Sequence, residues 1–418
     1  MEKSHICGCP QVARRATTLR DSTRGSNSLL GRRATSPSPP APCESAQIRY
    51  PEAWTHIGAR RDATRGLAAI QRHRFLSPVV PLLPGSPLTV SSSLAVRPSI
   101  VRVSQFAAVL LLLAKAWVMF VHPPVGDEAY YWLWGQKLDW SYFDHPPFHA
   151  WLLGLVSVIG WSLLSLRLLA WATLLGTLWI FWLWAKRMSP GSPSNWWWPA
   201  VALYLASPLY FAMTSIVFHD HLLIFLVVAT AHVLLVFAER FEAGHRDFRW
   251  LYAAAVLLGL AVLTKYNGAL LGLGMALFFV AHRPVRGVLR TPHPYLAALL
   301  SIAIQAPVLW WNLNESFASY TFHISERWGG TIPLELHPNG LSRYAVSALL
   351  WVSPFVFPAI AGMFLRPSGA PFADRARVLA LCVFGISTLT TGLLSLFVDV
   401  YFYWNIVACP LLFPLLAG

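Results

Sequence analysis

Charged residues are scarce in this 418-residue sequence. Asp, Glu, Lys and Arg make up 12% of it, whereas hydrophobic residues make up 56% and the mean hydropathy is +0.51. A soluble globular protein carries roughly 25% charged residues, so the scarcity excludes an ordinary soluble protein. The apolar residues gather in repeated segments of about 20 residues, which is the length that crosses a bilayer. The composition predicts a multi-pass membrane protein.

Cysteine is also sparse, and its spacing excludes two kinds of site. Cys7, Cys9 and Cys43 lie in the N-terminal region, and Cys382 and Cys409 lie in apolar segments. Cysteine in an apolar segment usually packs as a small hydrophobe. No CxxC or similar metal-binding spacing occurs. We therefore expect neither a cysteine metal site nor a disulfide framework.

Acidic residues are few, and the resulting charge of +14 is unevenly placed. Residues 1–99 hold 14 Lys and Arg against 5 Asp and Glu, and the remaining residues hold 18 against 13. The basicity therefore does not indicate nucleic acid as a partner of the core. Residues 1–98 are rich in Arg, Ser, Pro and Ala and lack the apolar core of a signal peptide. We expect a disordered extension, distantly similar to a transit peptide, and assign it no function.

From residue 100 the apolar segments follow one another closely. They run over 100–121, 166–185, 196–213, 217–238, 250–264, 267–281, 294–312, 341–365, 377–397 and 401–417. The run 148–163 is shorter and follows two prolines, so we expect a helix that lies at the outer membrane interface or dips into the membrane and returns. Placing the basic connections in the cytoplasm gives ten crossings with both termini cytoplasmic. The predicted fold is an all-α polytopic membrane domain over 99–418.

This topology gathers titratable residues on the extracytoplasmic side, in the loops 122–147 and 313–340 and at nearby segment ends. They are Asp127, Glu128, Asp144, His145, His219, Asp220, Lys265, Glu315, His323, Glu326, Arg327 and Asp399. A charge at the bilayer centre costs roughly 2.5–3.5 kcal/mol, so charges near helix ends need a reason. One-sided gathering favours a reaction centre at the outer surface. A transport path would instead place its binding groups near the midplane.

The first loop combines these acids with aromatic residues that prefer the membrane–water boundary. Asp127 follows a glycine and opens an apolar stretch, which predicts an N-cap, with Glu128 in the first turn. A capping acid with an acidic neighbour is the alternative interpretation. A carboxylate in a water-excluding site can accept a proton from an attacking hydroxyl. We therefore expect Asp127 and Glu128 to be catalytic.

Two further motifs carry acids beside imidazoles. Asp144 and His145 precede two prolines that stiffen the chain, and His145 could offer an N–H to a phosphate. The alternative is a simple loop-to-helix junction. His219, Asp220 and the following histidine could hold a divalent cation, but three consecutive helical residues point in different directions. Asp220 could instead orient a donor phosphate or its metal ion, and metal dependence stays open.

Cationic groups on the same side are candidates for phosphate contact. Lys265 ends an apolar segment on the face where the positive-inside bias disfavours lysine, and lysine is a good point-charge partner for phosphate. The alternative is a lysine that only extends toward the interface. In the second loop, His323 and Arg327 are weaker candidates for contact with the acceptor or the phosphate.

At these residues the chain resembles the GT-C glycosyltransferases, in the branch of the lipid A aminoarabinose transferases and protein O-mannosyltransferases (glycosyltransferase family 39-like). The pattern is GDEAYYW, YFDHPP, FHDH, LTKYNG and YFYWN, in this order over roughly residues 100–418. The resemblance implies a GT-C-like fold in the plasma (inner) membrane and a polyprenyl-phosphate sugar as donor. The acceptor would be a lipid, glycan or protein.

Carried over to this sequence, the resemblance makes Asp127 the general base and Glu128 its support. Asp144 and His145 would face the donor, together with His219 and Asp220, and Lys265 would neutralise the leaving phosphate. Many aminoarabinose transferases carry Lys where His145 stands, and this chain ends near its tenth expected crossing. The resulting hypothesis is inverting transfer of a hexosyl or pentosyl group to a hydroxyl. A transporter or lipid flippase, and a non-catalytic membrane scaffold, are the alternatives.

Overall fold

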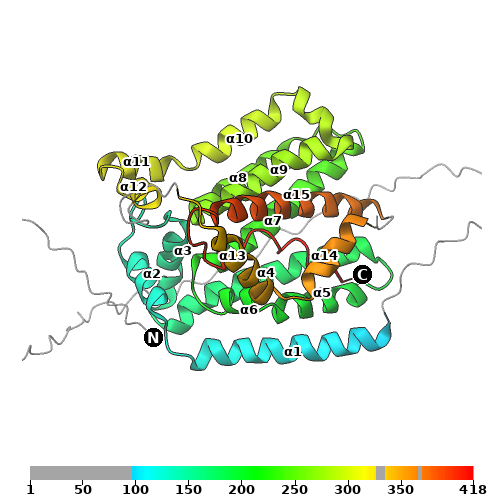
Figure 1. The fold of residues 1–418 in the computed structure, drawn as a ribbon, viewed down its shortest axis with the longest axis horizontal. Coiled ribbons are helices and arrows are strands. Elements are labelled where there is room, and N and C mark those ends of the chain that lie inside the picture. Colours follow the sequence, from blue (N-terminus) through cyan, green and yellow to red (C-terminus); the bar gives the residue numbers. More distant parts are fainter. Residues whose placement is uncertain (1–96, 326–334, 366–369, 418) are drawn as a thin grey trace, which may run out of the picture. The chain divides into compact units, whose positions relative to one another are not determined.

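The computed structural model describes residues 97–417 except 326–334 and 366–369. The chain divides into two units, residues 1–85 and 86–418, and everything below concerns the second. The described residues form helices and no strand (Figure 1). The predicted disordered extension and Arg327 lie outside them.

The first nine helical elements follow the order of the expected apolar segments. They are α1 Pro98–Val121, α2 Gly126–Gln136, α3 Phe148–Val156, η1 Ser157–Ile159, α4 Leu163–Met188, α5 Ser194–Ala206, α6 Pro208–Met213, α7 His219–Glu242 and α8 Arg249–Thr264. The remaining elements are η2 Tyr266–Gly268, α9 Ala269–Ala281, η3 Arg283–Arg290, α10 His293–Ala303, α11 Ala306–Asn314, α12 Ala318–Ile324, α13 Pro338–Val352, α14 Val356–Leu365 and α15 Pro371–Leu394.

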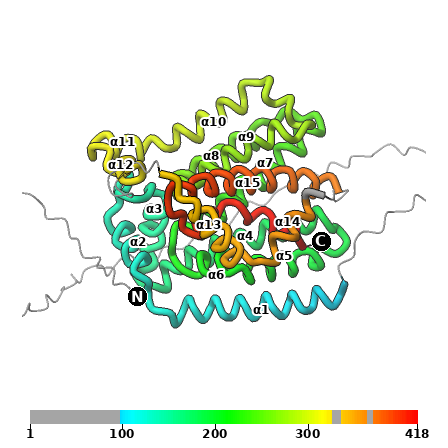
Figure 2. The backbone as a smooth tube through the Cα atoms, in the orientation of Figure 1, coloured from blue at the N-terminus to red at the C-terminus, as the bar shows by residue number. Residues whose placement is uncertain are grey.

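Helix α7 is the centre of the domain, and α1 lies at its edge (Figure 1). In the most apolar window of α7, 78% of the residues are buried, compared with 17% in α1. Apolar residues surround α7 on all sides, as expected for a helix buried among others. It packs against α4 and α8, while α9 packs against α15 and α1 against α5. Helices α11 and α12 lie beside α2 and α3 at one end of the helices (Figure 2).

Within the described part of the chain, four helices are long and apolar enough to cross a membrane: α1, α4, α7 and α15. Three bent pairs raise the number to seven if each pair is one span, and α8 and the α3–η1 run are shorter apolar helices. The all-α membrane fold is therefore confirmed, whereas the ten crossings stay a prediction. The run 148–163 is as short as expected for an interfacial helix.

Proline bends the apolar segments that hydropathy treats as continuous. The predicted segment 341–365 is two helices, α13 and α14, bent by 97° around Pro354, and α10 and α11 meet at 41° around Pro307. Proline lacks the backbone donor and disfavours helical geometry in the residue before it. Hydropathy does not register this, so the segments were predicted as single helices.

The expectation of a helical crossing at 401–417 was wrong. These residues form a succession of turns, and several of their apolar side chains are fully buried, among them Ile406, Val407 and Leu411. Two prolines within the stretch, Pro410 and Pro414, remove the amide donors that a helix needs. Side chains from other elements satisfy some of the freed carbonyls; the Tyr210 hydroxyl, for example, donates to the Ile406 oxygen at 2.8 Å.

Close packing of α9 on α15 gives a first prediction. A Cβ atom added at Gly274 would lie 2.7 Å from the Cα and Cγ2 atoms of Val383, whereas one at Gly385 on α15 would meet nothing within 4 Å. We expect Gly274→Ala to lower the free energy of unfolding by about 1–3 kcal/mol, because the two helix backbones must separate. Gly385→Ala should be neutral or stabilise by up to about 1 kcal/mol through helix propensity. Denaturant titration in detergent measures both, and equal stability of the two variants would contradict the close approach.

Candidate active site

A cavity of about 390 Å³ brings together residues that are far apart in the sequence. Its lining contains five of the predicted site residues, which come from α2, the loop before α3, α7, the α8–η2 junction and α12. They are Asp127, His145, Asp220, Lys265 and His323. The same cavity is lined by Tyr131 and by Tyr403 and Trp404 of the C-terminal turns. Five of the twelve titratable residues predicted to gather on one side therefore share one cavity.

Lys265 and Asp220 form a buried ion pair in the wall of this cavity. The Lys265 Nζ lies 2.7 Å from Asp220 Oδ1 and 3.0 Å from Oδ2, and both side chains are less than a tenth exposed. The backbone is extended at Lys265, which ends α8 before the single turn of η2. Lys265 Nζ also lies 4.7 Å from the ring centroid of Tyr403, within the range of a cation–π contact. The break between α8 and η2 thus positions a cation at the cavity, fixed by a carboxylate and a ring.

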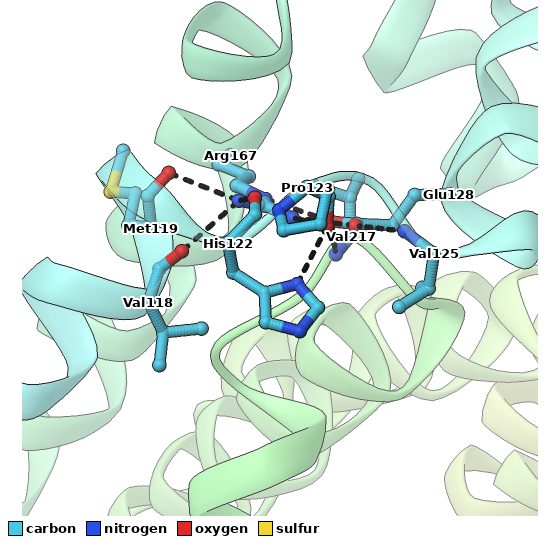
Figure 3. A network of polar contacts seen from close by, with 8 residues as sticks. All are labelled: Val118, Met119, His122, Pro123, Val125, Glu128, Arg167 and Val217. Atoms are coloured by element: carbon cyan, nitrogen blue, oxygen red, sulfur yellow. Dashed lines mark hydrogen bonds and ion pairs between the residues drawn. The ribbon is translucent and has the colours of Figure 1, made fainter.

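Glu128 lies beside this cavity but not in its lining, because its carboxylate binds Arg167 of α4 (Figure 3). Arg167 Nη2 lies 2.7 Å from Glu128 Oε2, and Arg167 Nε lies 3.0 Å from Oε1, with both side chains almost fully buried. Backbone amides supply further hydrogen bonds to the carboxylate: Val217 donates to Oε1 at 3.0 Å and Val125 to Oε2 at 3.1 Å. Glu128 thus joins α2, α4 and the residues before α7.

The remaining guanidinium donors of Arg167 secure the end of α1. Its Nη1 lies 3.1 Å from the carbonyl oxygens of Val118 and Met119 and 2.8 Å from that of His122 (Figure 3). These carbonyls belong to the helix C-terminus, where intrahelical donors run out and a cation is favoured. Arg167 therefore holds both α1, which precedes the first loop, and α2, the helix within that loop.

Two expectations about the first loop need correction. Asp127 is not the N-cap of α2: the helix begins at Gly126 and its N-cap is Val125, whose amide is capped by Glu128. Glu128 is not placed to touch substrate, because both of its oxygens are used in the network around Arg167. Asp127, one residue earlier, points to another face of the helix and is exposed at the cavity. The acidic pair therefore divides into a cavity residue and a positioning residue.

A row of neutral imidazoles lies behind the cavity wall. The single proton of the Thr173 hydroxyl goes to the Ala170 carbonyl at 2.9 Å, so Thr173 accepts from His221 Nδ1, also at 2.9 Å. Nε2 of His221 must then be an acceptor, and Nε2 of His149, 3.3 Å away, its donor. Burial lowers the pKa of His149 to about 3, which keeps its ring neutral at ordinary pH.

His219 and its neighbours in α7 point in different directions, as their consecutive positions predict. The His219 ring packs between His145 and His149, with ring centroids 4.3 and 4.5 Å away, while Asp220 reaches Lys265. His221 belongs to the row just described. Among the described residues, no group of three or more His, Cys, Asp or Glu is arranged to hold a metal ion.

Helices α11 and α12 close on the first loop through side chains at the cavity rim. His323 of α12 donates from Nε2 to the carbonyl oxygen of Asp144 at 3.0 Å, and Trp311 of α11 donates to the Asp139 carboxylate at 3.2 Å. The Asp144 carboxylate accepts from the Tyr130 hydroxyl at 3.4 Å. Burial, with the nearby charge of Asp144, raises the pKa of Tyr130 to about 12, so this phenol remains a donor.

Sequence reasoning missed Arg167 and Lys115, although a signal for both was present. Each is an ionisable residue inside an apolar segment, which by itself indicates a structural or functional site. Lys115 is buried in α1 and donates to the Phe211 carbonyl at 2.7 Å and to the hydroxyls of Thr214 and Ser215 at 2.8 and 2.7 Å. Both missed residues tie α1 to the domain, and neither lines the cavity.

Comparison with known proteins identifies the fold. The crystal structure of ArnT from Cupriavidus metallidurans bound to undecaprenyl phosphate superposes with a TM-score of 0.55 at 18% identity, covering 77% of this chain and 60% of that one. Its apo structure gives a TM-score of 0.53 at 19% identity, covering 75% and 59%. The chain has the GT-C glycosyltransferase fold.

Sequence comparison agrees with the GT-C fold. The dolichyl-phosphate-mannose-protein mannosyltransferase family matches residues 144–311. A lipid A galacturonosyltransferase of Rhizobium johnstonii is 26% identical over 299 residues, which is 68% of this chain and 57% of that protein. The chain therefore spans less than two thirds of the length of these relatives. The matched stretch includes His145, Asp220 and Lys265 but begins after Asp127.

The buried pair that positions the first loop of this GT-C domain yields a second prediction. Glu128→Gln keeps the side-chain shape but leaves the Arg167 charge uncompensated, and breaking a buried pair costs about 3–5 kcal/mol of unfolding free energy. The control is Glu239→Gln, which removes one partner of the exposed Arg187–Glu239 pair and should cost at most about 1 kcal/mol. Denaturant titration of both variants in detergent measures the difference; similar losses would refute the role of Glu128.

Proposed function

We propose that this chain is a membrane glycosyltransferase that moves a sugar from a polyprenyl-phosphate donor to an acceptor hydroxyl at the extracytoplasmic face. The observation that carries the proposal is the shared cavity, which holds a carboxylate, Asp127, and a cation, Lys265, on different walls. The acceptor oxygen attacks the anomeric carbon, the bond from that carbon to the phosphate oxygen breaks, and the configuration inverts. Transfer of a lipid-linked sugar needs both groups, because the acceptor hydroxyl loses a proton and the donor releases its phosphate as the leaving group.

Asp127 is the carboxylate best suited to be the general base. Four acids lie in or beside the cavity wall. Glu128 is neutralised by Arg167 and Asp220 by Lys265, while Asp144 is not part of the lining and its carboxylate accepts from the Tyr130 hydroxyl. Asp127 forms no ion pair within the described part of the chain and is exposed at the cavity. Its carboxylate is therefore not engaged by a cation, and its oxygens are open to the attacking hydroxyl.

Lys265 is the group proposed to stabilise the leaving phosphate. The negative charge of the donor phosphate grows as its bond to the sugar breaks, and a fixed cation in a site shielded from water stabilises that charge strongly. Asp220 holds the ammonium in place from behind, and His145 offers an imidazole from the opposite loop. Asp144 and His219 lie around His145, so their proposed role is to position it.

The acceptor side of the site is proposed to include His323. It lines the cavity, and its ring is held by the Asp144 carbonyl and by Tyr266, whose ring centroid is 5.0 Å away. Arg327, the other residue predicted for this role, is outside the described residues. The matched relative is a lipid A galacturonosyltransferase, and the matching family is that of protein mannosyltransferases. A lipid or protein hydroxyl is therefore the proposed acceptor class.

The base assignment is tested by Asp127→Asn. Purified protein is supplied with polyprenyl-phosphate sugars and a lipid or peptide acceptor, and transfer is followed by mass spectrometry. We expect kcat to fall by about 10²–10⁴-fold, because the amide cannot accept the proton. Asp399→Asn removes an equal charge at an exposed position and should leave transfer unchanged. Undiminished turnover in Asp127→Asn would remove this role.

The phosphate role is tested by Lys265→Met. We expect about a 10²–10³-fold loss of kcat, the range seen when one electrostatic donor is removed from a charge-stabilising site. The variant also leaves the Asp220 carboxylate buried without a partner, so Lys265→Met/Asp220→Asn serves as the matched control. The double variant should recover stability but not transfer. Recovery of transfer in the double variant would show that Lys265 only neutralises Asp220.

A further inference from the structure

The connection between α9 and α10 carries a basic surface at the end of α9 that is far from the cavity. Helix α9 begins at Ala269, which lines the cavity, and ends at Ala281. At about 1.5 Å per residue, this helix spans roughly 20 Å. The chain then turns by 104° into η3, so η3 runs across the end of the helix pair instead of continuing it. This orientation suits a segment that lies along a membrane surface.

The two faces of η3 have opposite character. Val285 and Val288 are fully buried in the main hydrophobic core, whereas Arg283, Arg286 and Arg290 are exposed. A 3₁₀-helix has three residues per turn, so the two valines form one ridge and Arg283 and Arg286 form another. The apolar face is occupied by the protein itself, which leaves the arginines directed outward.

No carboxylate of the described residues pairs with the arginines of η3; Glu242, which contacts His282 directly before η3, is bound by Arg375. No Asp or Glu occurs between residues 248 and 314. In the described ranges, the three arginines of η3 form no ion pair. Arg286 donates through Nε and Nη2 to the Val280 carbonyl at 3.0 and 2.5 Å, which fixes its guanidinium over the end of α9. The surface therefore offers a fixed cation with two further cations beside it.

Exposed apolar side chains begin where the arginines end. On α9, Leu273, Leu277 and Val280 are 55%, 39% and 52% exposed and recur at the spacing of one helix face. On α10, Leu296 and Leu299 are 48% and 60% exposed. Side chains of this kind facing outward from a membrane domain contact lipid chains, so the arginines lie at the level of the headgroups.

Tyr295 supports this placement. Its side chain is 62% exposed at the first turn of α10, and its hydroxyl donates to the Leu289 carbonyl at 3.0 Å, so the ring lies between η3 and the exposed face of α10. Tyrosine is enriched at the boundary between hydrocarbon and headgroups. A guanidinium can donate two parallel N–H bonds to a phosphate, which gives such a boundary a preference for phosphate over other groups.

We propose that η3 and the adjoining ends of α9 and α10 form a binding site for an anionic phospholipid. Arg283, Arg286 and Arg290 contact its phosphate headgroup, and its acyl chains lie along the exposed face of α9 and α10. The site is in the leaflet away from the catalytic cavity and is independent of the proposed transfer reaction.

Native mass spectrometry of the full chain, released from detergent with defined lipids, tests the proposal. The probes are phosphatidylglycerol and phosphatidylcholine with the same acyl chains. We expect the protein to retain phosphatidylglycerol in about tenfold preference, because basic clusters at a membrane surface favour anionic lipid. The variant R283Q/R286Q/R290Q should lose most of this preference, and R97Q/R102Q/R249Q, which removes three exposed arginines elsewhere, should keep it.

Three outcomes would overturn the site. The first is an unmodified protein that shows no preference for phosphatidylglycerol. The second is an equal loss of preference in both triple variants, which indicates general attraction to positive charge. The third is full competition by inorganic phosphate, which indicates a site for free phosphate. Because Arg286 also caps α9, its loss in the triple variant destabilises the fold as well as removing charge. The single variants Arg283→Gln and Arg290→Gln leave this cap intact, and each should lower the preference several-fold.

Discussion

The position of the first loop depends on the buried ion pair between Glu128 and Arg167. An uncompensated charge inside a membrane domain is costly, and this pair avoids the cost by using nearly every donor and acceptor it has. Its partners come from the end of α1, the start of α2, α4 and the residues before α7. Asp127 lies in the first turn of α2, the helix that this pair fixes, so the direction of its carboxylate is set by the interactions of Glu128. A single position in the chain separates the structural acid from the proposed base.

The same constraint explains the second charged element of the cavity. Lys265 interrupts an apolar stretch, and the chain leaves the helical conformation there, which frees the side chain to reach Asp220 on α7. Asp220 in turn is in the first turn of the most buried helix, where the helix dipole favours an anion. The ion pair is therefore supported from both sides by backbone geometry. Its cation can be shared with an incoming phosphate without leaving a bare carboxylate in the protein interior.

Hydropathy and charge placement predicted the class of fold and the gathering of Asp127, Asp220 and Lys265, because both depend on the cost of moving charge out of water. They could not predict interactions that join distant elements. Arg167 and Glu128 are 39 positions apart, and nothing local indicates that they pair. The turns over 401–417 look like a membrane span by composition, since hydropathy does not count the donors that Pro410 and Pro414 remove. The motif YFYWN contains Tyr403, but its place in the cavity could not be predicted, because its neighbours are set by that irregular segment.

The imidazole row explains why the layer behind the cavity wall contains histidines and not more charged groups. Thr173 fixes the tautomer of His221, whose Nε2 accepts from His149, and burial keeps His149 neutral, so the row is polar but carries no net charge. Further cations behind the wall would compete with Lys265 for Asp220, and further carboxylates would repel a phosphate. A neutral row neither competes with Lys265 nor repels a phosphate, so the electrostatic field in the cavity is set by the charged residues of the cavity itself. The different charge environments of Asp127 and the Lys265–Asp220 pair thus depend on the neutral residues around them as well as on the pair itself.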